Sequence, residues 1–227
     1  MWWRTIGVLL LAVAVAAVCL AQEKPVKPPR GSIVLFDGKD LSKWVSRDGK
    51  SPARWEITPD GAMQVKAGTG DIMTRDEFGS FQLHIEFNIP AMPQASGQGR
   101  GNSGVYLHGL YEIQVLDSYQ NETYAKGGCA AIYGIKDPDK NVARPPGQWQ
   151  TYDIIFIAPR FDDAGNVIAN PRVTLRWNGV LVHDNVEIPH ITAGGISDKM
   201  RKTGPILLQD HGNPVKYRNI WIRPLKD

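Results

Sequence analysis

Cysteine is scarce in this sequence, and no long helical pattern is present. The chain has 227 residues and 2 cysteines, and only Cys129 lies outside the apolar N-terminal run. The mature chain therefore cannot form an intrachain disulfide, and its stability must come from core packing. A lone cysteine of this kind is expected to be a small buried hydrophobe rather than a nucleophile. No window of about eleven residues keeps an apolar 3.6-residue period without Gly or Pro, which excludes a helical bundle and leaves one helical turn expected at residues 197–202.

A strong charge excess is also absent. The 26 Lys and Arg residues nearly balance the 23 Asp and Glu residues. Binding to nucleic acid or to an anionic membrane surface needs a basic patch, and this balance provides no sign of one. We therefore expect no nucleic-acid partner, and membrane contact only through the N-terminal signal.

Residues 1–21 have the pattern of an export signal. Arg4 gives the charged start, residues 6–20 form an uncharged apolar run, and Cys19-Leu20-Ala21 offers a small-residue cleavage site. The apolar run is shorter than the roughly 20 residues that a membrane span needs. We therefore predict an exported protein, periplasmic or secreted; an uncleaved anchor and a lipid on Cys19 are the alternatives.

A short linker and one domain follow the signal. Residues 22–30 hold three prolines and three basic residues, a composition that favours an extended tether over a packed element. Residues 31–227 are long enough for one well-cored domain. No second boundary or repeat is visible within them.

Strand patterns dominate this domain. Residues 81–89 alternate between apolar and polar side chains, which predicts a long strand with one buried face. Residues 149–157 become apolar on both faces, which predicts a central strand covered on both sides. Asn178-Gly179 between two β-rich runs predicts a hairpin with a type I′ turn. Other strands are expected at 32–36, 54–57, 62–65, 172–177, 180–183, 205–209 and 217–224. The fold class predicted is all-β, an antiparallel jelly-roll β-sandwich.

The densest polar stretch is Gly101–Asp117, where Gly109-Leu110 separates two strand-like halves. Strict alternation places Glu112 and Gln114 on one face and sends Asp117 to the other. A β-bulge after Gln114 would bring Asp117 back beside them. The bulged pattern resembles the Glu-x-Asp-x-x-Glu strand of laminarinase- and lichenase-type glucanases.

The departure from that glucanase pattern affects the chemistry. Gln114 stands where the glucanases have their middle acid, and Asp117 is shorter than their last glutamate. A retaining glycosidase needs two carboxyl groups roughly 5–5.5 Å apart. We therefore do not transfer the glucanase mechanism. The alternative that Glu112 and Asp117 only orient neighbouring groups by hydrogen bonds stays open.

Several further blocks in order resemble the 3-keto-disaccharide hydrolase domain family. They are Phe36–Trp44, Gly101–Leu107, Tyr111–Tyr119, Arg144–Asp153, Asn178-Gly179 and Leu208–Ile220. The resemblance covers nearly the whole domain. It implies a concanavalin A-like jelly roll, an exported location and activity on glycosides already oxidised at C3. A separate sugar 3-dehydrogenase would supply that oxidised carbohydrate substrate.

The implied chemistry needs a particular set of groups. A ketone at C3 acidifies the proton at C2, so a base can remove it and the glycosidic oxygen leaves by elimination. Water then adds back, or the 2-hydroxyglycal departs. The site needs a base, an acid near the leaving oxygen, and donors or a metal on the enolate. The candidate acids and bases are Glu112, Asp117, His108 and His211. The candidates that orient the sugar or stabilise an oxyanion are Arg100, Tyr106 and Gln114.

The segment Gln209–Asn213 gathers four polar groups around a glycine at a strand end, where functional loops often lie. Gln209, Asp210 and Asn213 are candidate substrate-binding residues. Asp210 could orient His211, or both could hold a divalent metal with Glu112 or His108. The alternative is a structural turn in which Asp and Asn cap their own backbone. No cofactor is certain from the sequence.

Two other groups of side chains are candidates for the same cleft. His84 and Glu86 share the polar face of their strand, and a plain polar outer face is the alternative. The tryptophans that could stack on a sugar are Trp44, Trp55, Trp149, Trp177 and Trp221, although most tryptophans on such strands are core residues.

The sequence leaves three functions open. The leading hypothesis is an exported enzyme that cleaves 3-keto-glycosides by elimination and rehydration. The rivals are a non-catalytic, lectin-like carbohydrate-binding module and a glucanase-type glycosidase on unoxidised glycan. The arrangement of Glu112, Asp117 and a histidine around one sugar ring discriminates between them.

Overall fold

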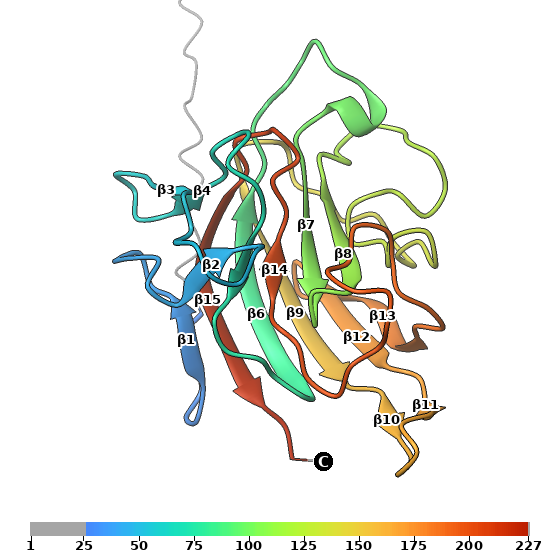
Figure 1. Cartoon of the computed structure of the whole chain (residues 1–227). Helices are drawn as coiled ribbons and strands as arrows, with labels where there is room; N and C mark the ends of the chain where they lie inside the picture. Colours follow the sequence, from blue (N-terminus) through green and yellow to red (C-terminus); the bar gives the residue numbers. More distant parts are fainter. Residues whose placement is uncertain (1–25, 227) are drawn as a thin grey trace, which may run out of the picture.

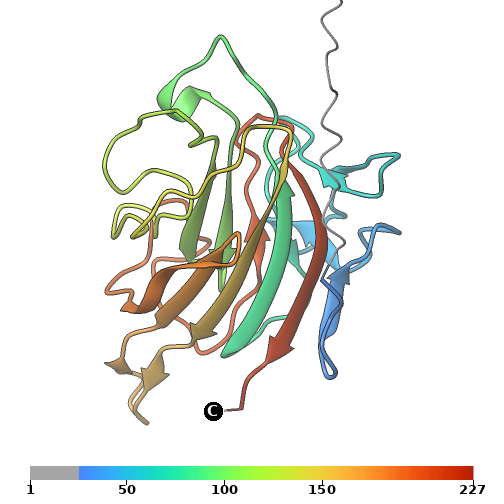
Figure 2. The same ribbon diagram turned by 180° about the vertical axis from the view of Figure 1, so that it is seen from behind.

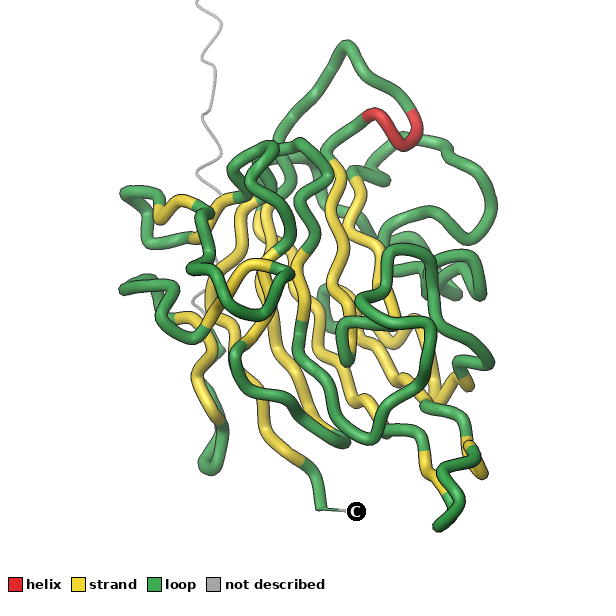
Figure 3. The backbone as a smooth tube through the Cα atoms, in the orientation of Figure 1, coloured by secondary structure: helices red, strands yellow, loops and turns green. Residues whose placement is uncertain are grey.

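The structure, a computed structural model, describes residues 26–226. The predicted signal and residues 22–25 of the linker lie outside the described residues. Two antiparallel sheets face each other across one core (Figures 1 and 2), which confirms the predicted all-β sandwich. Strands and loops make up nearly all of the tube in Figure 3, where the helical segment is the short 3-10 turn η1, Gly97–Gly99.

The larger sheet has eight strands. Its path is β13 (Val180–Glu187), β12 (Arg172–Trp177), β9 (Trp149–Ile157), β6 (Phe81–Asn88), β15 (Lys216–Pro224), β4 (Met63–Gln64) and β3 (Glu56–Ile57), with β1 (Ile33–Phe36) paired to β15. The β12–β13 hairpin turns at Asn178 and Gly179, whose φ angles are 51° and 79°. Positive φ at both positions is what a type I′ turn requires, so the predicted hairpin is confirmed.

The smaller sheet has five strands. Their order is β2 (Trp44–Ser46), β5 (Ile72–Thr74), β14 (Leu207–Leu208), β7 (Asn102–Leu107) and β8 (Tyr111–Leu116). A separate two-stranded ribbon is formed by β10 (Arg160–Phe161) and β11 (Val167–Ala169). The sequence patterns did not predict β2, β5, β10 or β11, because runs of two or three residues are too short to show a period of two.

The core lies between the two sheets. On β6 the side chains of Phe81, Leu83, Ile85 and Phe87 are fully buried in it. The alternate residues of β6 face away from the core, as the predicted period of two requires. Each sheet therefore has a second face that is free to carry polar groups.

Two predictions about elements are wrong. Residues 197–202 form bends and irregular backbone rather than a helical turn. Strand β9 is central, between β12 and β6, but its outer face is not covered, since Ile155 and Ile157 are 45% and 41% exposed. An apolar residue on a strand shows only that burial is tolerated there, not that another layer exists. Within residues 26–226, no helix is long and apolar enough to cross a membrane.

Candidate active site

The hairpin of β7 and β8 places the polar side chains of the 101–117 stretch. The two strands pair in register from Asn102 opposite Leu116 to Leu107 opposite Tyr111. The chain reverses at His108 and Gly109, with φ angles of 54° and 66°. Alternate residues of both strands enter the core, so the intervening ones lie on the outer face of the five-stranded sheet. These outward residues include Tyr106, Glu112 and Gln114.

A pocket of about 150 Å³ opens over this outer face. It is walled by two strands of the sheet and by loops that arrive from three distant parts of the chain. Its lining residues are Gln98, Asn102, Tyr106, Glu112, Gln114, Tyr133, Ala193, Gly194, Gln209 and His211. The strand bearing Glu112 and the Gln209–Asn213 loop thus meet at one pocket.

Glu112 lies at the base of this pocket and is 3% exposed. Burial raises the pKa of its carboxyl to about 7, against the lowering effect of the hydrogen bond from Tyr106; the nearby Asp71 raises it further. Water stabilises a carboxylate better than a buried site does, which is why burial favours the protonated form. Near neutral pH this group can therefore both accept and release a proton.

The strand opposite Glu112 is shaped to leave room for its carboxyl group. A side chain at Gly104 would place its Cβ 2.5 Å from Glu112 Oε1 and 2.9 Å from the Tyr106 ring. Both distances are too short for van der Waals contact. Glycine at position 104 therefore lets the two side chains lie against the sheet.

Tyr106 connects Glu112 to two other parts of the pocket. Its hydroxyl lies 2.9 Å from Glu112 Oε2 and 3.1 Å from the carbonyl oxygen of Ala193, and its one hydrogen can go to either. Gln209 Nε2 donates to the same hydroxyl at 3.3 Å. Burial and the negative charge of Glu112 raise the pKa of Tyr106 above its usual range, so Tyr106 stays a donor at neutral pH.

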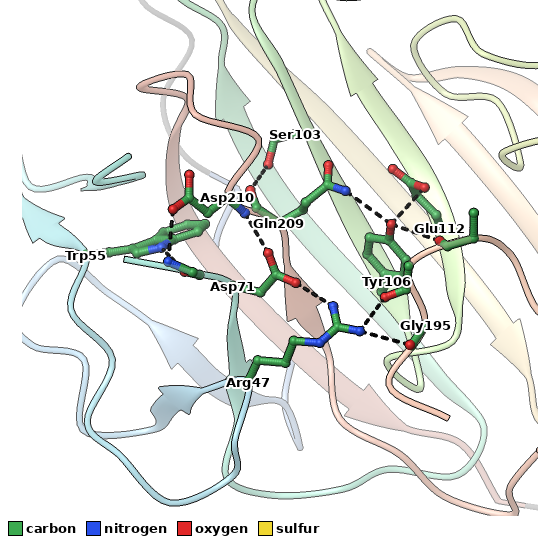
Figure 4. A network of polar contacts seen from close by, with 12 residues as sticks. Arg47, Trp55, Asp71, Ser103, Tyr106, Glu112, Gly195, Gln209 and Asp210 are labelled. Carbon is green, nitrogen blue, oxygen red and sulfur yellow. Dashed lines mark hydrogen bonds and ion pairs between the residues drawn. The ribbon is translucent and has the colours of Figure 1, made fainter. Parts of the chain in front are cut away.

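The segment 192–195 is held by hydrogen bonds at both of its ends; Figure 4 shows the contact of Arg47 with Gly195. Thr192 Oγ1 accepts a hydrogen bond from the Glu112 backbone N–H at 2.9 Å. On the other side, Arg47 donates to the carbonyl oxygens of Gly194 and Gly195 at 2.7 and 2.9 Å. Arg47 is held in turn by Asp71, with 2.6 Å between Nη1 and Oδ2. This chain of contacts crosses the sheet from β2 to β8.

Two buried oxygen atoms in the pocket have no hydrogen-bond partner among the described residues. They are Asn102 Oδ1 and Gln209 Oε1. Buried acceptors without a partner are costly, and native structures rarely keep them. Both atoms belong to pocket-lining residues but are closed off from solvent, so a donor reaches them only if neighbouring side chains move.

The predicted bulge is wrong, and Asp117 does not join Glu112. The β7–β8 register continues without a shift through Leu116. Asp117 lies beyond the end of β8, where its Oδ2 is 3.1 Å from Arg100 Nη1. Arg100 also donates to the carbonyl oxygens of Ala95 and Tyr119 at 3.1 and 3.2 Å. Neither side chain lines the pocket, so this ion pair fixes loops rather than a substrate.

His108 is not at the pocket either. It is fully buried at the hairpin turn, with its ring 4.7 Å from that of Phe156 and 6.2 Å from that of Phe81. Its Nε2 is 3.0 Å from the carbonyl oxygen of Gly79. Burial lowers its pKa, so His108 is a neutral core residue. His108 was a candidate because it lies in the polar 101–117 stretch. In the structure it sits in the hairpin turn, and its ring faces the core.

His84 and Glu86 lie on the outer face of the eight-stranded sheet, away from the pocket. Asp153 Oδ1 is 2.6 Å from His84 Nδ1, and Arg218 Nε is 2.6 Å from Glu86 Oε2. Burial lowers the pKa of His84, but its hydrogen bonds with Asp153 and Glu86 outweigh this and raise it to about 9. The two residues form a compensated charge cluster on a sheet surface, and the predicted role in the cleft is wrong.

The loop after β14 divides into pocket and scaffold residues. Gln209 and His211 line the pocket, and His211 is exposed. Asp210 accepts hydrogen bonds from the backbone N–H groups of Gly70 and Gly212, each at 2.9 Å. Asn213 Oδ1 accepts from the Asn102 N–H at 2.9 Å. Asp210 matches the turn interpretation, whereas Asn213 fastens the loop to the start of β7; neither residue lines the pocket.

The tryptophans considered for sugar stacking are absent from the pocket lining. Four of them are buried: Trp44, Trp55, Trp177 and Trp221. Trp149 is partly buried under the guanidinium of Arg218, which lies 4.0 Å from the centre of its ring. The aromatic residues that line the pocket are instead Tyr106 and Tyr133.

Neither a metal cluster nor a reactive thiol accompanies the pocket. Across residues 26–226, no group of three or more His, Cys, Asp or Glu side chains is placed to hold a metal ion. The predicted metal set of Asp210 and His211 with Glu112 or His108 does not form such a group in the described chain, and His108 lies in the core. Cys129 is buried, and burial raises its thiol pKa to about 11, so it is a core residue as expected.

Several pocket residues could not be found from the sequence. Gln98, in the turn η1, and Tyr133 and Ala193, in loops, belong to no chemical motif, and their positions depend on the tertiary fold. Asn102 alone had a signal, since it opens the polar 101–117 stretch.

This chain is similar to known proteins over most of its length. A family model described as the 3-keto-alpha-glucoside-1,2-lyase-like domain matches residues 31–223. The chain belongs to this family. A relative named 3-keto-disaccharide hydrolase, from Bacteroides thetaiotaomicron, is 25% identical over 240 residues, covering 86% of this chain and 79% of that protein.

Solved structures of similar proteins agree with this membership. A crystal structure of a candidate glycosyl hydrolase from Parabacteroides distasonis has a TM-score of 0.80 and 41% identity, covering 89% of this chain and 93% of that one. A second candidate glycosyl hydrolase from the same organism has a TM-score of 0.63 and 22% identity, covering 86% and 94%. This second likeness shows the shared fold alone.

Proposed function

We propose that the protein is an exported carbohydrate-active enzyme that cleaves the glycosidic bond of 3-keto-glycosides. The reaction is proton abstraction at C2, elimination of the glycosidic oxygen and rehydration. Glu112 is the base in this proposal. Membership of the 3-keto-alpha-glucoside-1,2-lyase-like family and the name of the Bacteroides relative support the substrate class.

The observation that carries the proposal is the number of carboxylates at the pocket. Glu112 is the one carboxylate that lines it, among the residues that the structure describes. Glycosidases of the usual kind flank the scissile bond with two carboxyl groups, one acting as an acid and the other as a nucleophile or base. A substrate whose C2 proton is already acidified by a ketone needs only one strong base. A single buried carboxyl with a pKa of about 7 suits that task.

The proposed reaction starts at the acidified C2 proton. The Glu112 carboxylate takes the C2 proton, and the electron pair of the C–H bond forms the enolate of the C3 ketone. Collapse of the enolate breaks the C1–O bond, and the leaving oxygen takes a proton from His211 or water. Water adds to C1 and gives its remaining proton to His211 or to solvent, while C2 regains a proton from Glu112. Net hydrolysis results, and release before water adds gives the lyase product.

Neighbouring side chains have supporting roles in this proposal. Tyr106 keeps the base oriented through its hydroxyl. Gln209 Nε2 donates one hydrogen to Tyr106 and has a second one for the enolate oxygen. Both hydrogens of Gln114 Nε2 are held by Gln98 and Gly127, so Gln114 shapes the pocket wall.

The test compares purified protein on a 3-keto-glucoside and on its unoxidised counterpart, with and without a chelator. We expect turnover of the keto sugar only, and the chelator arm measures any contribution of a divalent metal. Glu112→Gln should lower kcat by about 10²–10⁴-fold, the usual contribution of a general base. Glu56→Gln, an exposed glutamate on β3, is the matched control and should leave kcat unchanged.

Other outcomes would favour the rival functions. Equal turnover of both sugars would contradict elimination and favour an ordinary glycosidase. Sugar binding without turnover of either substrate would favour a carbohydrate-binding module. A fully active Glu112→Gln enzyme would remove Glu112 from the catalytic role.

A further inference from the structure

The pocket is too small for a whole disaccharide. Its volume is about 150 Å³, whereas sites for small-molecule ligands typically measure about 300–1,000 Å³. The reacting ring can enter it, and the second ring of a disaccharide must lie outside its mouth. Where that ring binds decides the leaving group that the enzyme prefers.

Two tyrosines stand at one side of the mouth. Tyr133 lines the pocket, and its hydroxyl contacts the hydroxyl of Tyr124. The two rings are 6.4 Å apart between centroids, with 76° between their planes. They form an aromatic corner, defined here as Tyr124 and Tyr133, that extends from the pocket to solvent.

Tyr124 is unusually exposed for such a residue. Its side chain is 55% exposed. The other large hydrophobic side chains that are exposed in residues 26–226 are all aliphatic. An exposed aromatic ring presents a rigid apolar surface and a polar tip, which suits a pyranose with its C–H face and its hydroxyl rim. An exposed ring at this position is therefore suited to contact with a sugar ring.

The loop that carries Tyr124 is held in place from the pocket side. Gln98, a pocket residue, donates through Nε2 to Thr123 Oγ1 at 2.8 Å and to the Gly127 carbonyl oxygen at 2.7 Å. These two partners flank Tyr124 in the chain. At Gly127 an added Cβ would lie 2.3 Å from the Tyr124 ring, so the backbone packs directly against it. The ring is thus ordered before any ligand binds, which reduces the entropy cost of binding.

We propose that the aromatic corner of Tyr124 and Tyr133 is the binding subsite for the second sugar ring, the one released as leaving group. This assignment rests on the proposed function for the identity of the reacting ring. The rival location is the groove of about 660 Å³ near Arg47, Arg54 and Asp71. That groove lies on the other side of the Arg47–Asp71 pair from the pocket and is bordered by charged groups that are already paired, so we favour the corner.

The experiment compares two substrates that share the reacting ring. One is a 3-keto-disaccharide of two glucose units, and the other is methyl 3-keto-glucoside, which lacks the second ring. For Tyr124→Ala we expect kcat/KM to fall roughly tenfold on the disaccharide and less than about twofold on the methyl glycoside. Tyr124→Phe keeps the ring and should retain most of the activity. Arg54→Ala, in the rival groove, should change neither value.

Three results would overturn the assignment. They are an unchanged Tyr124→Ala enzyme, an equal loss on both substrates, and a disaccharide-specific loss in Arg54→Ala instead. Failure of the proposed function gives a different result, since the wild-type enzyme would then turn over neither keto sugar. In that case calorimetric binding of the two sugars to wild type and Tyr124→Ala decides the subsite: a loss of affinity confined to the disaccharide supports it, and equal affinities contradict it.

Discussion

Glu112 shows how one buried residue is prepared for acid–base chemistry. Its carboxyl is 3% exposed, and Tyr106 is the side chain found to hydrogen-bond it within residues 26–226. A fully paired carboxylate would have a low pKa and would be a poor base. Burial with a single neutral donor keeps the pKa near 7, where a group can take a proton and return it.

The pH dependence of the reaction should follow from that hydrogen bond. The bond from Tyr106 stabilises the charged carboxylate and lowers the Glu112 pKa, so Tyr106→Phe should raise it. A base acts in its deprotonated form, and wild-type kcat/KM should therefore rise with pH through about 7. In Tyr106→Phe the same rise should move to higher pH. A pH profile of kcat/KM on a 3-keto-glucoside measures both values, since it reports the free enzyme.

A neighbouring tyrosine provides the matched control. Tyr111 lies on the same hairpin but faces the core, and its buried hydroxyl has no partner among the described residues. Tyr111→Phe should leave the pH profile unchanged. A Tyr106→Phe profile that coincides with wild type would show that another group sets the pKa of the base.

At the scale of elements, the pocket depends on one hairpin and the loops fastened above it. The regular pairing of β7 and β8 fixes Glu112 and Tyr106 on the outer face of the sheet. The segment 192–195 then closes the pocket, held at the far edge of the sheet by Arg47. The strands define the floor, and contacts between distant loops define the walls.

Arg47→Lys should therefore weaken catalysis while the fold stays intact. Arginine reaches Asp71 and two carbonyl oxygens at once because its donors are spread over a planar guanidinium, which lysine lacks. The released segment would shift against Tyr106, and we expect kcat/KM to fall roughly tenfold. Kinetics together with thermal melting measures this. Arg54→Lys is the control, because Arg54 makes one hydrogen bond, to the Thr69 carbonyl oxygen. A similar fall in kcat/KM for Arg54→Lys would show that the effect comes from general loosening of the groove near Arg47 and Arg54.

At the scale of the whole molecule, the two outer sheet faces serve different purposes. The outer face of the five-stranded sheet carries the pocket. The outer face of the eight-stranded sheet carries the paired charges of His84, Glu86, Asp153 and Arg218. Burying charges is costly unless each has a partner, and here each has one. This face therefore shows charge compensation instead of an accessible reactive group.

The chain as a whole should be exported. Expressed at full length in a bacterial host, the protein should appear in the periplasm or medium with the mass of a chain beginning at Gln22, because residues 1–21 have the pattern of a cleaved signal. Fractionation and intact-mass measurement test this. Membrane retention that Cys19→Ala abolishes would instead indicate a lipid anchor, and a mass that includes residues 1–21 would contradict cleavage.

Periodicity made much of the fold predictable. Long strands such as β6 and β15 and the Asn178-Gly179 turn have local signals, because side-chain alternation and positive φ are properties of short segments. Four short strands, β2, β5, β10 and β11, had none. The site was predictable only where it coincided with a strand: Glu112 and Gln114 share a face because they are two residues apart. The bulge that would have added Asp117 was wrong, since a bulge depends on the partner strand.

The sequence by itself determined an all-β sandwich and one polar strand face bearing Glu112, because both follow from residue types and a period of two. Only the tertiary structure decided which distant side chains meet that face. It brought Tyr133, Gln209 and His211 to the pocket, and it placed His108 in the core and His84 on the opposite surface. The reason is physical: alternation fixes a side chain's direction within its own strand, while loop paths and sheet order, set by packing of the entire core, fix its neighbours.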